Sequence, residues 1–318
     1  MKHVRIVLDT DPGIDDALAI LYLAAQPQAE IVAVGSVHGN VPAPQAADNA
    51  LRVLELAGLD TVPVAVGARR PLAQPLHTAE FVHGHDGLGG HAGPAPRGRP
   101  IPESAAEQLV RLARQHPGEL TLLALGPLTN IALALLLEPE LPQLLRSVVV
   151  MGGSLTAPGN ITPSADANAW HDPEATDLVL GAGFPLTLIG LDVTETARAD
   201  QTWLNRLAAI DTPRAHFATN IIGHYADFYA TMFGRREVTL HDPLAAAITL
   251  DPDLATYRRL AVGVELTGTH TRGRLIADLR PILTTTHIES PLADRHPVDV
   301  ALTADADTFL TRLLEALS

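Results

Sequence analysis

Short apolar runs alternate with longer amphipathic or apolar stretches along the chain as far as residue 190. The short runs are continuous in Val, Ile and Leu, which is typical of strands in a parallel sheet that is covered on both faces. The predicted strands are Val4–Leu8, Ile31–Val37, Val62–Val66, Leu120–Leu125, Ser147–Met151 and Pro185–Leu191. The predicted helices between them are Asp15–Ala25, Pro44–Ala57, Ser104–His116, Leu128–Leu137 and Pro173–Leu180.

This alternation predicts an α/β fold with a doubly wound, mostly parallel sheet and flanking helices. The last third is predicted to be mostly helical as far as Leu250. Strands at Val262–Leu266 and Arg274–Asp278 then form a pair, and Val298–Leu302 and Asp305–Leu317 form a final strand and helix. The Gly- and Pro-rich stretch Gly84–Pro102 is predicted to be one surface loop. Because the chain has no repeat or long linker, we expect a single domain over residues 1–318.

Polar or glycine-rich segments follow four of the predicted strands directly. They are Asp9–Asp16, "HGN" at His38–Asn40, "LGPLTN" at Leu125–Asn130 and "MGGS" at Met151–Ser154. In open α/β sheets, ligands bind outside the carboxyl ends of the strands. The pattern therefore predicts that these four segments meet at one edge of the sheet and form a binding site there.

The segment after the first strand is unusually acidic. Four carboxylates fall within its eight residues, namely Asp9, Asp11, Asp15 and Asp16. A helix start needs one capping carboxylate, as Asp172 before Pro173 supplies for the helix that follows it. Two carboxylates about 4 Å apart repel each other by about 4 kcal/mol at an effective dielectric constant near 20. Either some of them are protonated, or a cation binds among them. Oxygen ligands favour a hard ion, Ca²⁺ or Mg²⁺.

Composition and charge exclude several other kinds of protein. The chain of 318 residues has 22 Lys and Arg against 36 Asp and Glu, a net charge of −14, which disfavours a nucleic-acid partner. It has no cysteine, which excludes disulfides, thiolate zinc sites and cysteine nucleophiles. Its one lysine is Lys2, so it has no phosphate-binding loop of the Gly-Lys-Ser/Thr type. For the same reason we do not expect a phosphatase of the class that needs a lysine beside an Asp-x-Asp nucleophile.

The sequence also bears on location. No apolar run approaches the roughly 18 residues of a membrane helix, so we expect no membrane association. The first strand begins at Val4, which leaves no room for a secretory signal. We therefore expect a cytoplasmic protein.

Histidines and aromatic residues form two further candidate groups. His77, His83, His85 and His91 lie in or near "HGHDGLGGH", which is open to interpretation as a zinc loop. The glycine content and the lack of cysteine favour a mobile lid instead. Five of the twelve aromatic residues are Phe217, Tyr225, Phe228, Tyr229 and Phe233. From Tyr225 onward their spacing of three and four residues predicts a helical stripe, which is core in most proteins.

Taken together, these motifs resemble a known family. "DTDPGIDDA" is similar to the N-terminal signature of the inosine-uridine preferring nucleoside hydrolases. The other landmarks, in family order, are "VHGN", "HGHDGLGG", "LGPLTNIA", "VVVMGGS", "GNITPSADANAWHDPEA", "IGLDVT", "HDPLA" and "VELTG". The resemblance covers the full chain. It implies the nucleoside hydrolase fold and the hydrolysis of ribonucleosides to ribose and a free purine or pyrimidine base, as in nucleoside salvage.

The resemblance implies one Ca²⁺ at the carboxyl ends of the strands. The matching ligands are Asp11, Asp16 through both oxygens, the main-chain carbonyl of Leu125, and Asp242. A water molecule and the 2′- and 3′-hydroxyls of the substrate would complete the coordination.

The resemblance also implies a set of substrate contacts. Asp15, Asn40, Asn160 and Asn168 match ribose-binding positions, and Met151 would pack near the sugar. Asp166 stands where the family more often has Glu, which binds the 5′-hydroxyl. The shorter side chain leaves two alternatives, a bridging water or a tighter pocket. His83 matches a position that faces the base, and Tyr225 and Tyr229 would stack on the base or form hydrogen bonds with it.

The N-glycosidic bond breaks through a positively charged, oxocarbenium-like sugar. We assign Asp11 as the general base, because it would bind the ion beside the attacking water. His241 directly precedes Asp242, so we assign it as the general acid for the departing base and expect neighbouring acids to raise its pKa.

Two other functions stay open from the sequence. A metal-dependent phosphoesterase would use the same acidic edge, but it should need a basic phosphate clamp, and the four polar segments contain neither lysine nor arginine. A non-catalytic nucleoside-binding protein could dispense with His241 and with a water-activating carboxylate. The sequence does not decide between purine and pyrimidine substrates. We expect a homodimer or a homotetramer, between which the sequence does not decide either.

Overall fold

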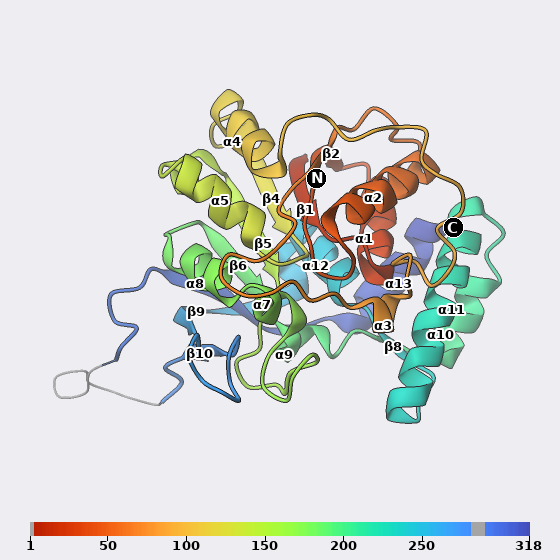
Figure 1. Ribbon diagram of the computed structural model, residues 1–318. Helices are drawn as coiled ribbons and strands as arrows, with labels where there is room; N and C mark the ends of the chain where they lie inside the picture. Colours follow the sequence, from red (N-terminus) through yellow and green to blue (C-terminus); the bar gives the residue numbers. More distant parts are fainter. Residues whose placement is uncertain (1–2, 281–289) are drawn as a thin grey trace.

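The computed structural model describes residues 3–280 and 290–318 and is built around a central β-sheet (Figure 1). The nine strands that the described residues contribute to it are β1 (Val4–Thr10), β2 (Ala29–Ser36), β3 (Val64–Val66), β4 (Leu120–Ala124), β5 (Ser147–Met151), β6 (Leu186–Ile189), β9 (Ala255–Val264), β10 (Leu275–Ala277) and β11 (Pro297–Ala304). A separate antiparallel pair consists of β7 (Arg198–Ala199) and β8 (Val238–Thr239).

The helices connect the strands. They are α1 (Ile14–Ala24), α2 (Ala43–Ala57), α3 (Glu80–His83), α4 (Ala105–Gln115), α5 (Thr129–Leu137), α6 (Leu141–Leu144), α7 (Ala167–His171), α8 (Pro173–Gly181), α9 (Leu191–Thr194), α10 (Gln201–Ala208), α11 (Pro213–Phe233), α12 (His241–Leu250) and α13 (Ala306–Leu317), with a short 3₁₀ turn at Pro252–Leu254.

The strand order is β10-β9-β11-β6-β5-β4-β1-β2-β3. All neighbours from β3 to β11 are parallel, and β9 is antiparallel to both β10 and β11. The chain builds β2 and β3 on one side of β1 and then returns to build β4, β5 and β6 on the other side. The connections after β1 and β4 therefore diverge, which in doubly wound folds opens a crevice for a ligand.

The predicted fold class is confirmed, and most main elements are confirmed with shifts of one to a few residues at their ends. The exception is β9, which begins at Ala255, seven residues before the predicted start at Val262. Strand β1 continues two residues beyond the prediction, because Asp9 and Thr10 pair with Gly35 and Ser36 of β2. The predicted cap of α8 is also present, since Asp172 accepts a hydrogen bond from the Ala175 amide at 3.1 Å. The prediction missed β7, β8 and the helices of four or five residues, which are too short to show a periodic pattern.

Helices cover both faces of the sheet (Figure 1), and buried apolar side chains form a layer on each face. On one face, Ile6 and Leu8 of β1 pack with α1, α2, α11, α12 and α13. On the other face, Val7 packs with α4, α5 and α8. Helix α1 packs against β2 and is surrounded by the helices α2, α11, α12 and α13, which explains why it is apolar on nearly all sides. Within the described residues, no helix combines the length and apolar character needed to cross a bilayer.

The core layer under α13 leads to a prediction about stability. Leu313 on α13 is fully buried, whereas the side chain of Leu136 on α5 is 65% exposed. We expect Leu313→Ala to lower the free energy of unfolding by about 2–5 kcal/mol, because it leaves a cavity in the core. Leu136→Ala, the matched control, should change it by no more than about 0.5 kcal/mol. Denaturant titration followed by circular dichroism measures both values, and equal losses would contradict the assigned packing.

Candidate active site

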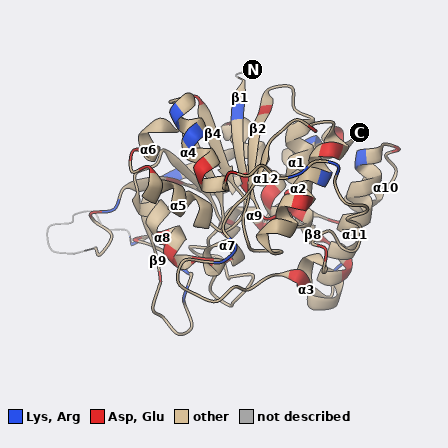
Figure 2. Ribbon diagram, turned by 45° about the horizontal axis from the view of Figure 1, so that its top comes forward, with Lys and Arg blue, Asp and Glu red and all other residues tan. Residues whose placement is uncertain are grey.

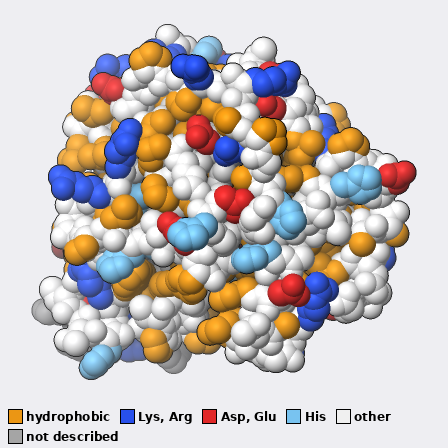
Figure 3. Space-filling model, turned by 45° about the vertical axis from the view of Figure 1, so that its right-hand side comes forward, with side chains coloured by type: hydrophobic (Ala, Val, Ile, Leu, Met, Phe, Trp, Pro, Cys, Tyr) orange, Lys and Arg blue, Asp and Glu red, His pale blue; other side chains and the backbone are white. Residues whose placement is uncertain are grey.

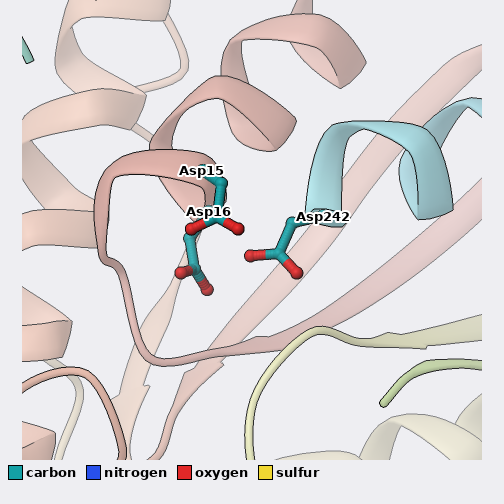
Figure 4. A group of neighbouring side chains, drawn as sticks. All are labelled: Asp15, Asp16 and Asp242. Atoms are coloured by element: carbon teal, nitrogen blue, oxygen red, sulfur yellow. The ribbon is translucent and has the colours of Figure 1, made fainter. Parts of the chain in front are cut away.

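Three buried carboxylates meet at the carboxyl edge of the sheet (Figure 4). Asp15 and Asp16 lie in the first turn of α1, and Asp242 lies in the first turn of α12. One oxygen from each lies within 4.8 Å of the others. Among the described residues, this is the one group of histidine or acidic side chains placed to hold a metal ion. The ribbon coloured by charge shows acidic positions where α1 approaches α12 (Figure 2).

Glycines allow the loops after β1, β2 and β4 to approach this group closely. A Cβ atom on Gly39 would lie 2.0 Å from Asp11 Oδ2, and one on Gly126 would lie 2.6 Å from Asp11 Oδ1. A Cβ atom on Gly13, the residue that precedes α1, would lie 2.7 Å from Asn40 Nδ2. Any larger residue at these positions would push the polar loops apart.

Hydrogen bonds fix the orientation of the Asp16 carboxylate. Its Oδ1 accepts from the Thr10 hydroxyl and, at 3.3 Å, from the Asp11 amide. Its Oδ2 accepts from the Gly13 amide and from Asn40 Nδ2, both at 3.0 Å. The loop after β1 and the residue Asn40 after β2 are thus tied together through one side chain.

Asp11 lies beside the three-residue group. Its Oδ2 accepts from the Asn40 amide at 2.6 Å. Its Oδ1 is buried and has no hydrogen-bond partner among the described residues. A buried carboxylate oxygen without a donor is unfavourable unless a cation or a proton compensates it. The donor set at this edge, consisting only of oxygen atoms, matches what a hard divalent cation binds.

The loop after β4 reaches the same place. The carbonyl oxygen of Leu125, which precedes Gly126, accepts from Asn168 Nδ2 at 2.6 Å. The same amide group donates to the Met151 carbonyl at 3.1 Å. The structure therefore places Leu125, Met151 and Asn168 together at the ends of β4 and β5.

Burial dominates the electrostatics of the acidic residues. Burial, followed by the charge of Asp16, raises the pKa of Asp15 to about 8. Burial and neighbouring carboxylates raise the pKa of Asp11 and of Asp242 well above the usual range. The pKa of Asp16 is also raised, with burial as the main cause. A bound cation would reverse these shifts, because it stabilises the ionised forms.

Asp9 does not belong to this group, although it is part of the same acidic segment. Because side chains alternate along β1, Asp9 lies with Val7 on the face of the sheet that α4 and α5 cover. There its Oδ2 accepts from Asn130 Nδ2 at 2.8 Å. Asn130 also donates to the Ser36 carbonyl at 2.9 Å and accepts from the Ala68 amide at 2.8 Å. Burial raises the pKa of Asp9 to about 7. No local sequence pattern indicates this role of Asn130, which links β1 and β2 with the backbone after β3.

His241 begins α12 and is buried beside Asp242. Its Nδ1 forms a hydrogen bond with the Thr194 hydroxyl at 2.8 Å. Burial lowers the pKa of His241, and the opposing effect of Glu195 is smaller. The expectation that nearby acids raise this pKa is therefore wrong for the structure described, because the ring is fully enclosed. Thr194 was also missed, since no sequence pattern links "IGLDVT" to residue 241.

His83 is the last residue of α3, and its side chain contacts the start of α1. Its Nδ1 accepts from the Ile14 amide at 3.1 Å, and its ring packs on Tyr225 with the centroids 5.5 Å apart. Burial, followed by the charges of His224 and His241, lowers the pKa of His83 to about 3. It is therefore neutral at neutral pH.

The other histidines near the Gly-rich loop have separate partners. His85 contacts Glu80 at 2.7 Å, and His77 packs on the Trp170 ring. Within the described part of the chain, no histidine takes part in a group that could hold a metal, so the zinc interpretation is wrong. The Asp86 carboxylate organises the loop by accepting from the amides of Leu88, Gly90 and Ala92 at 2.8–3.0 Å. A role as a mobile lid stays a prediction.

The aromatic stripe on α11 is divided between core and site. Phe217, Phe228 and Tyr229 pack against the core, as predicted for a stripe, but the Phe233 side chain is 59% exposed. Tyr225 is buried, and its hydroxyl lies 3.5 Å from that of Tyr229. Burial raises the pKa of Tyr225 well above its usual value, and the neighbouring charges include that of Asp15. Tyr225 therefore lies within electrostatic range of the acidic group.

Asn160 and Asp166 lie on the long segment after β5. Asn160 is exposed, and its Oδ1 accepts from the Ala167 amide at 2.9 Å. Asp166 is buried and caps α7, because its Oδ1 accepts from the amides of Gly153 and Ala169 at 2.7 and 2.9 Å. In the space-filling view, histidine side chains surround acidic side chains near the middle of the surface (Figure 3).

Known proteins resemble this chain over nearly its whole length. A family model described as inosine-uridine preferring nucleoside hydrolase matches residues 6–311. The probable uridine nucleosidase 2 of Arabidopsis thaliana is 36% identical over 315 residues, which are 98% of this chain and 97% of the relative. The inosine-uridine preferring nucleoside hydrolase of Crithidia fasciculata has the same identity over the same length, with the same shares of both chains.

Solved structures agree with these matches. The structure described as the plant nucleoside hydrolase PpNRh1 has a TM-score of 0.95 and 32% sequence identity, and the alignment covers 99% of this chain and 98% of that one. A purine-preferring ribonucleoside hydrolase from Gardnerella vaginalis has a TM-score of 0.89 and 30% identity, with 98% of both chains covered.

The raised pKa values generate a prediction for the metal-free and metal-loaded protein. The pKa of Asp15 rises from 3.8 to about 8, so the metal-free folded state binds protons that the unfolded chain has lost in this window. Stability from this group is therefore present at low pH and is lost as the pH rises toward about 8. A divalent cation displaces those protons, so its stabilising effect should grow with pH by about 1.4 kcal/mol per pH unit for each proton displaced.

The measurement is the difference in melting temperature with saturating calcium and with excess EGTA, taken at intervals from about pH 5 to pH 8. Taking the difference cancels groups that the ion does not affect. Asp15→Asn should flatten the dependence, whereas Asp211→Asn, at a position with a 96% exposed side chain, should not. A calcium effect of constant size across the range would contradict the prediction.

Proposed function

Because the chain belongs to the inosine-uridine preferring nucleoside hydrolase family and is a ribonucleoside N-glycosidase, we propose that its hydrolytic site is the acidic edge of the sheet. We further propose that this site depends on Ca²⁺, with Asp11 as the general base and His241 as the general acid. The products are ribose and a free purine or pyrimidine base. The observation that supports the site best is the buried group of Asp15, Asp16 and Asp242 beside the unpartnered Oδ1 of Asp11.

The residues present suit a calcium ion. We propose that Asp11, Asp16, Asp242 and the carbonyl of Leu125 hold it, because they offer only oxygen atoms and most of them are carboxylates whose burial is unfavourable without a cation. Bound there, Ca²⁺ would supply Lewis acidity, which would lower the pKa of the attacking water and favour the binding of ribose hydroxyls.

Asp11 is proposed as the general base. Calcium is a mild Lewis acid, so a carboxylate must take the proton of the attacking water. The amide of Asn40 fixes one oxygen of Asp11, and the other oxygen has no donor and is available to accept that proton.

The ribose contacts come from several loops. Asp15 and Asn40 would bind hydroxyls beside the ion, and Met151 would pack against the sugar. Asn168 is held by the carbonyls of Leu125 and Met151, which leaves its own amide oxygen for a ribose hydroxyl. Held in this way, the sugar needs little further ordering to reach the transition state. Asn160 and Asp166 are proposed to contact the 5′-hydroxyl.

The departing base needs a proton donor. We assign His241, and we infer that the Thr194 hydroxyl fixes its ring so that the other nitrogen presents its N–H to the base. Burial lowers the pKa of the imidazole, so the ring is neutral before reaction and its free N–H would donate a hydrogen bond to the base. Negative charge that develops on the leaving base would favour the imidazolium form, which gives a proton to the base and returns to the neutral ring. His83, Tyr225 and Tyr229 would line the base side of the pocket.

Other properties stay predictions. These are a cytoplasmic location, a role in nucleoside salvage, and assembly as a homodimer or homotetramer. The base preference is also open, since relatives include both a probable uridine nucleosidase and a purine-preferring ribonucleoside hydrolase.

A kinetic panel with inosine, adenosine, uridine and cytidine tests the proposed function. We expect release of free ribose from at least one of them, loss of activity after exhaustive EGTA dialysis, and recovery with calcium. Asp11→Ala should lower kcat by about 10²- to 10⁴-fold and weaken calcium binding, because it removes both the base and a ligand. Asp60→Ala, at an exposed position, is the control.

Other outcomes separate the alternatives. Phosphate release from nucleotides without ribose release would favour the phosphoesterase. Tight nucleoside binding without turnover would favour the binding protein. Full activity after EGTA dialysis would refute the calcium site.

The acid role of His241 has a test of its own. His241→Ala should lower kcat for the best nucleoside by about 10²- to 10⁴-fold, because the base then leaves without a proton. The same variant should hydrolyse p-nitrophenyl riboside almost as fast as the wild type, because p-nitrophenolate leaves without protonation. Steady-state kinetics on both substrates measure the effect, and equal losses would refute the assignment.

A further inference from the structure

The segment of residues 154–166 joins β5 to α7 and carries Asn160 and Asp166. It contains neither helix nor strand, so few of its backbone groups are paired within regular structure. Its own hydrogen bonds form small turns, for example from the Asn160 amide to the Ala165 carbonyl at 3.2 Å. What holds its first half against the rest of the protein is a pair of charged side chains, one acidic and one basic, from distant parts of the chain.

The acidic member is Asp192, in the first turn of α9 after β6. Its Oδ2 accepts from the Leu155 amide at 2.8 Å. Its Oδ1 accepts from the amides of Thr156 and Ala157 at 2.7 and 2.9 Å. Burial alone would raise the pKa of Asp192, but these hydrogen bonds and one from the Thr156 hydroxyl lower it, so the carboxylate is ionised at neutral pH. One carboxylate therefore binds three consecutive amides.

The basic member is Arg274, next to β10. Its Nη1 donates to the carbonyls of Ala157 and Ser164 at 2.7 and 3.1 Å and to Ser154 Oγ at 3.3 Å. Its Nη2 donates to the Leu155 carbonyl. Among the described residues it forms no salt bridge. The guanidinium group thus binds carbonyls at both the start and the end of the segment.

Further contacts join the same two parts of the chain. Gly153 has a φ of +79°, and a Cβ atom there would lie 2.0 Å from Leu275 Cδ1, so Leu275 packs directly against the backbone. The Ser164 hydroxyl donates to the His270 carbonyl at 2.7 Å. The turn that leads into β10 therefore serves as a support for the segment.

We propose that Asp192 and Arg274 are positioning residues of the active site, which hold residues 154–166 so that Asn160 and Asp166 bind the 5′-hydroxyl end of the ribose. This inference rests on the proposed function. The amides are bound from one side and the carbonyls from the other, so the backbone of the segment has one preferred position. Both Asn160 and Asp166 also use a side-chain oxygen to bind the backbone at the start of α7, so a shift of the segment displaces both.

The proposal predicts a selective loss. Arg274→Met keeps much of the side-chain length and removes every donor. It should lower kcat/KM for the best ribonucleoside by between about tenfold and a hundredfold. For the 5′-deoxy analogue of that nucleoside, which lacks the hydroxyl in question, the loss should be several-fold smaller. The preference for the 5′-hydroxyl, measured as the ratio of the two kcat/KM values, should therefore fall toward one.

Matched variants complete the test. Arg280→Met removes an exposed arginine six residues further along, which contacts Asp278, and it should leave the ratio unchanged. Asp192→Asn replaces one acceptor oxygen by an amide group that cannot accept, and it should lower the ratio in the same way as Arg274→Met. Asp211→Asn is its exposed control. The double variant of Asp192 and Arg274 should lose less than the product of the two single losses, because both act through one segment.

Each outcome decides the proposal. An equal loss on both substrates shows that Arg274 supports the fold alone and overturns it, as does a wild-type ratio of one. If Arg274→Met does not fold, as shown by its melting curve, Asp192→Asn and Arg274→Lys carry the same comparison. A wild-type protein that hydrolyses neither nucleoside would instead refute the proposed function, which is a separate result.

Discussion

The enclosure of negative charge at the carboxyl edge of the sheet is the constraint on which the rest of the site depends. Asp11, Asp15, Asp16 and Asp242 are all buried, and burial together with mutual repulsion raises their pKa values. Such an arrangement is unfavourable for a folded protein on its own, because desolvated carboxylates must be protonated or compensated. A hard divalent cation, as proposed for this site, would compensate them and would also supply the chemistry that a ribonucleoside hydrolase needs. The instability of the bare site and its proposed function therefore have the same physical origin.

The topology of the sheet brings these charges together. Strand β1 lies between β2 and β4, so the loops that follow β1 and β4 leave toward opposite faces and open a crevice between them. Asp242 enters the crevice from α12, a helix that packs on α1. A residue more than 200 positions away from Asp16 thus completes the group. A segment that lacks either Asp16 or Asp242 could therefore not build the site.

Polar side chains then hold the loops in place, since loops at a sheet edge lack regular backbone pairing. Asn130 links β1, β2 and the backbone after β3, and Asp86 organises the Gly-rich loop. Asp192 and Arg274 do the same for residues 154–166. In each case a charged or amide side chain binds several backbone groups at once, so one or two side chains are enough to fix a loop. The catalytic groups can then lie on loops and still be held in position.

The amino-acid sequence by itself determined the fold class, most elements and the presence of an acidic site, because periodicity and strand-end polarity are local properties. Through the family resemblance it also indicated residues as distant as Asp242. Only the tertiary structure decided that Asp9 points away from the acidic group and binds Asn130 instead. It also decided that His241 is enclosed, so that its pKa falls, and that Thr194 binds His241. Burial and contacts between distant segments set these features, and a linear pattern does not contain them.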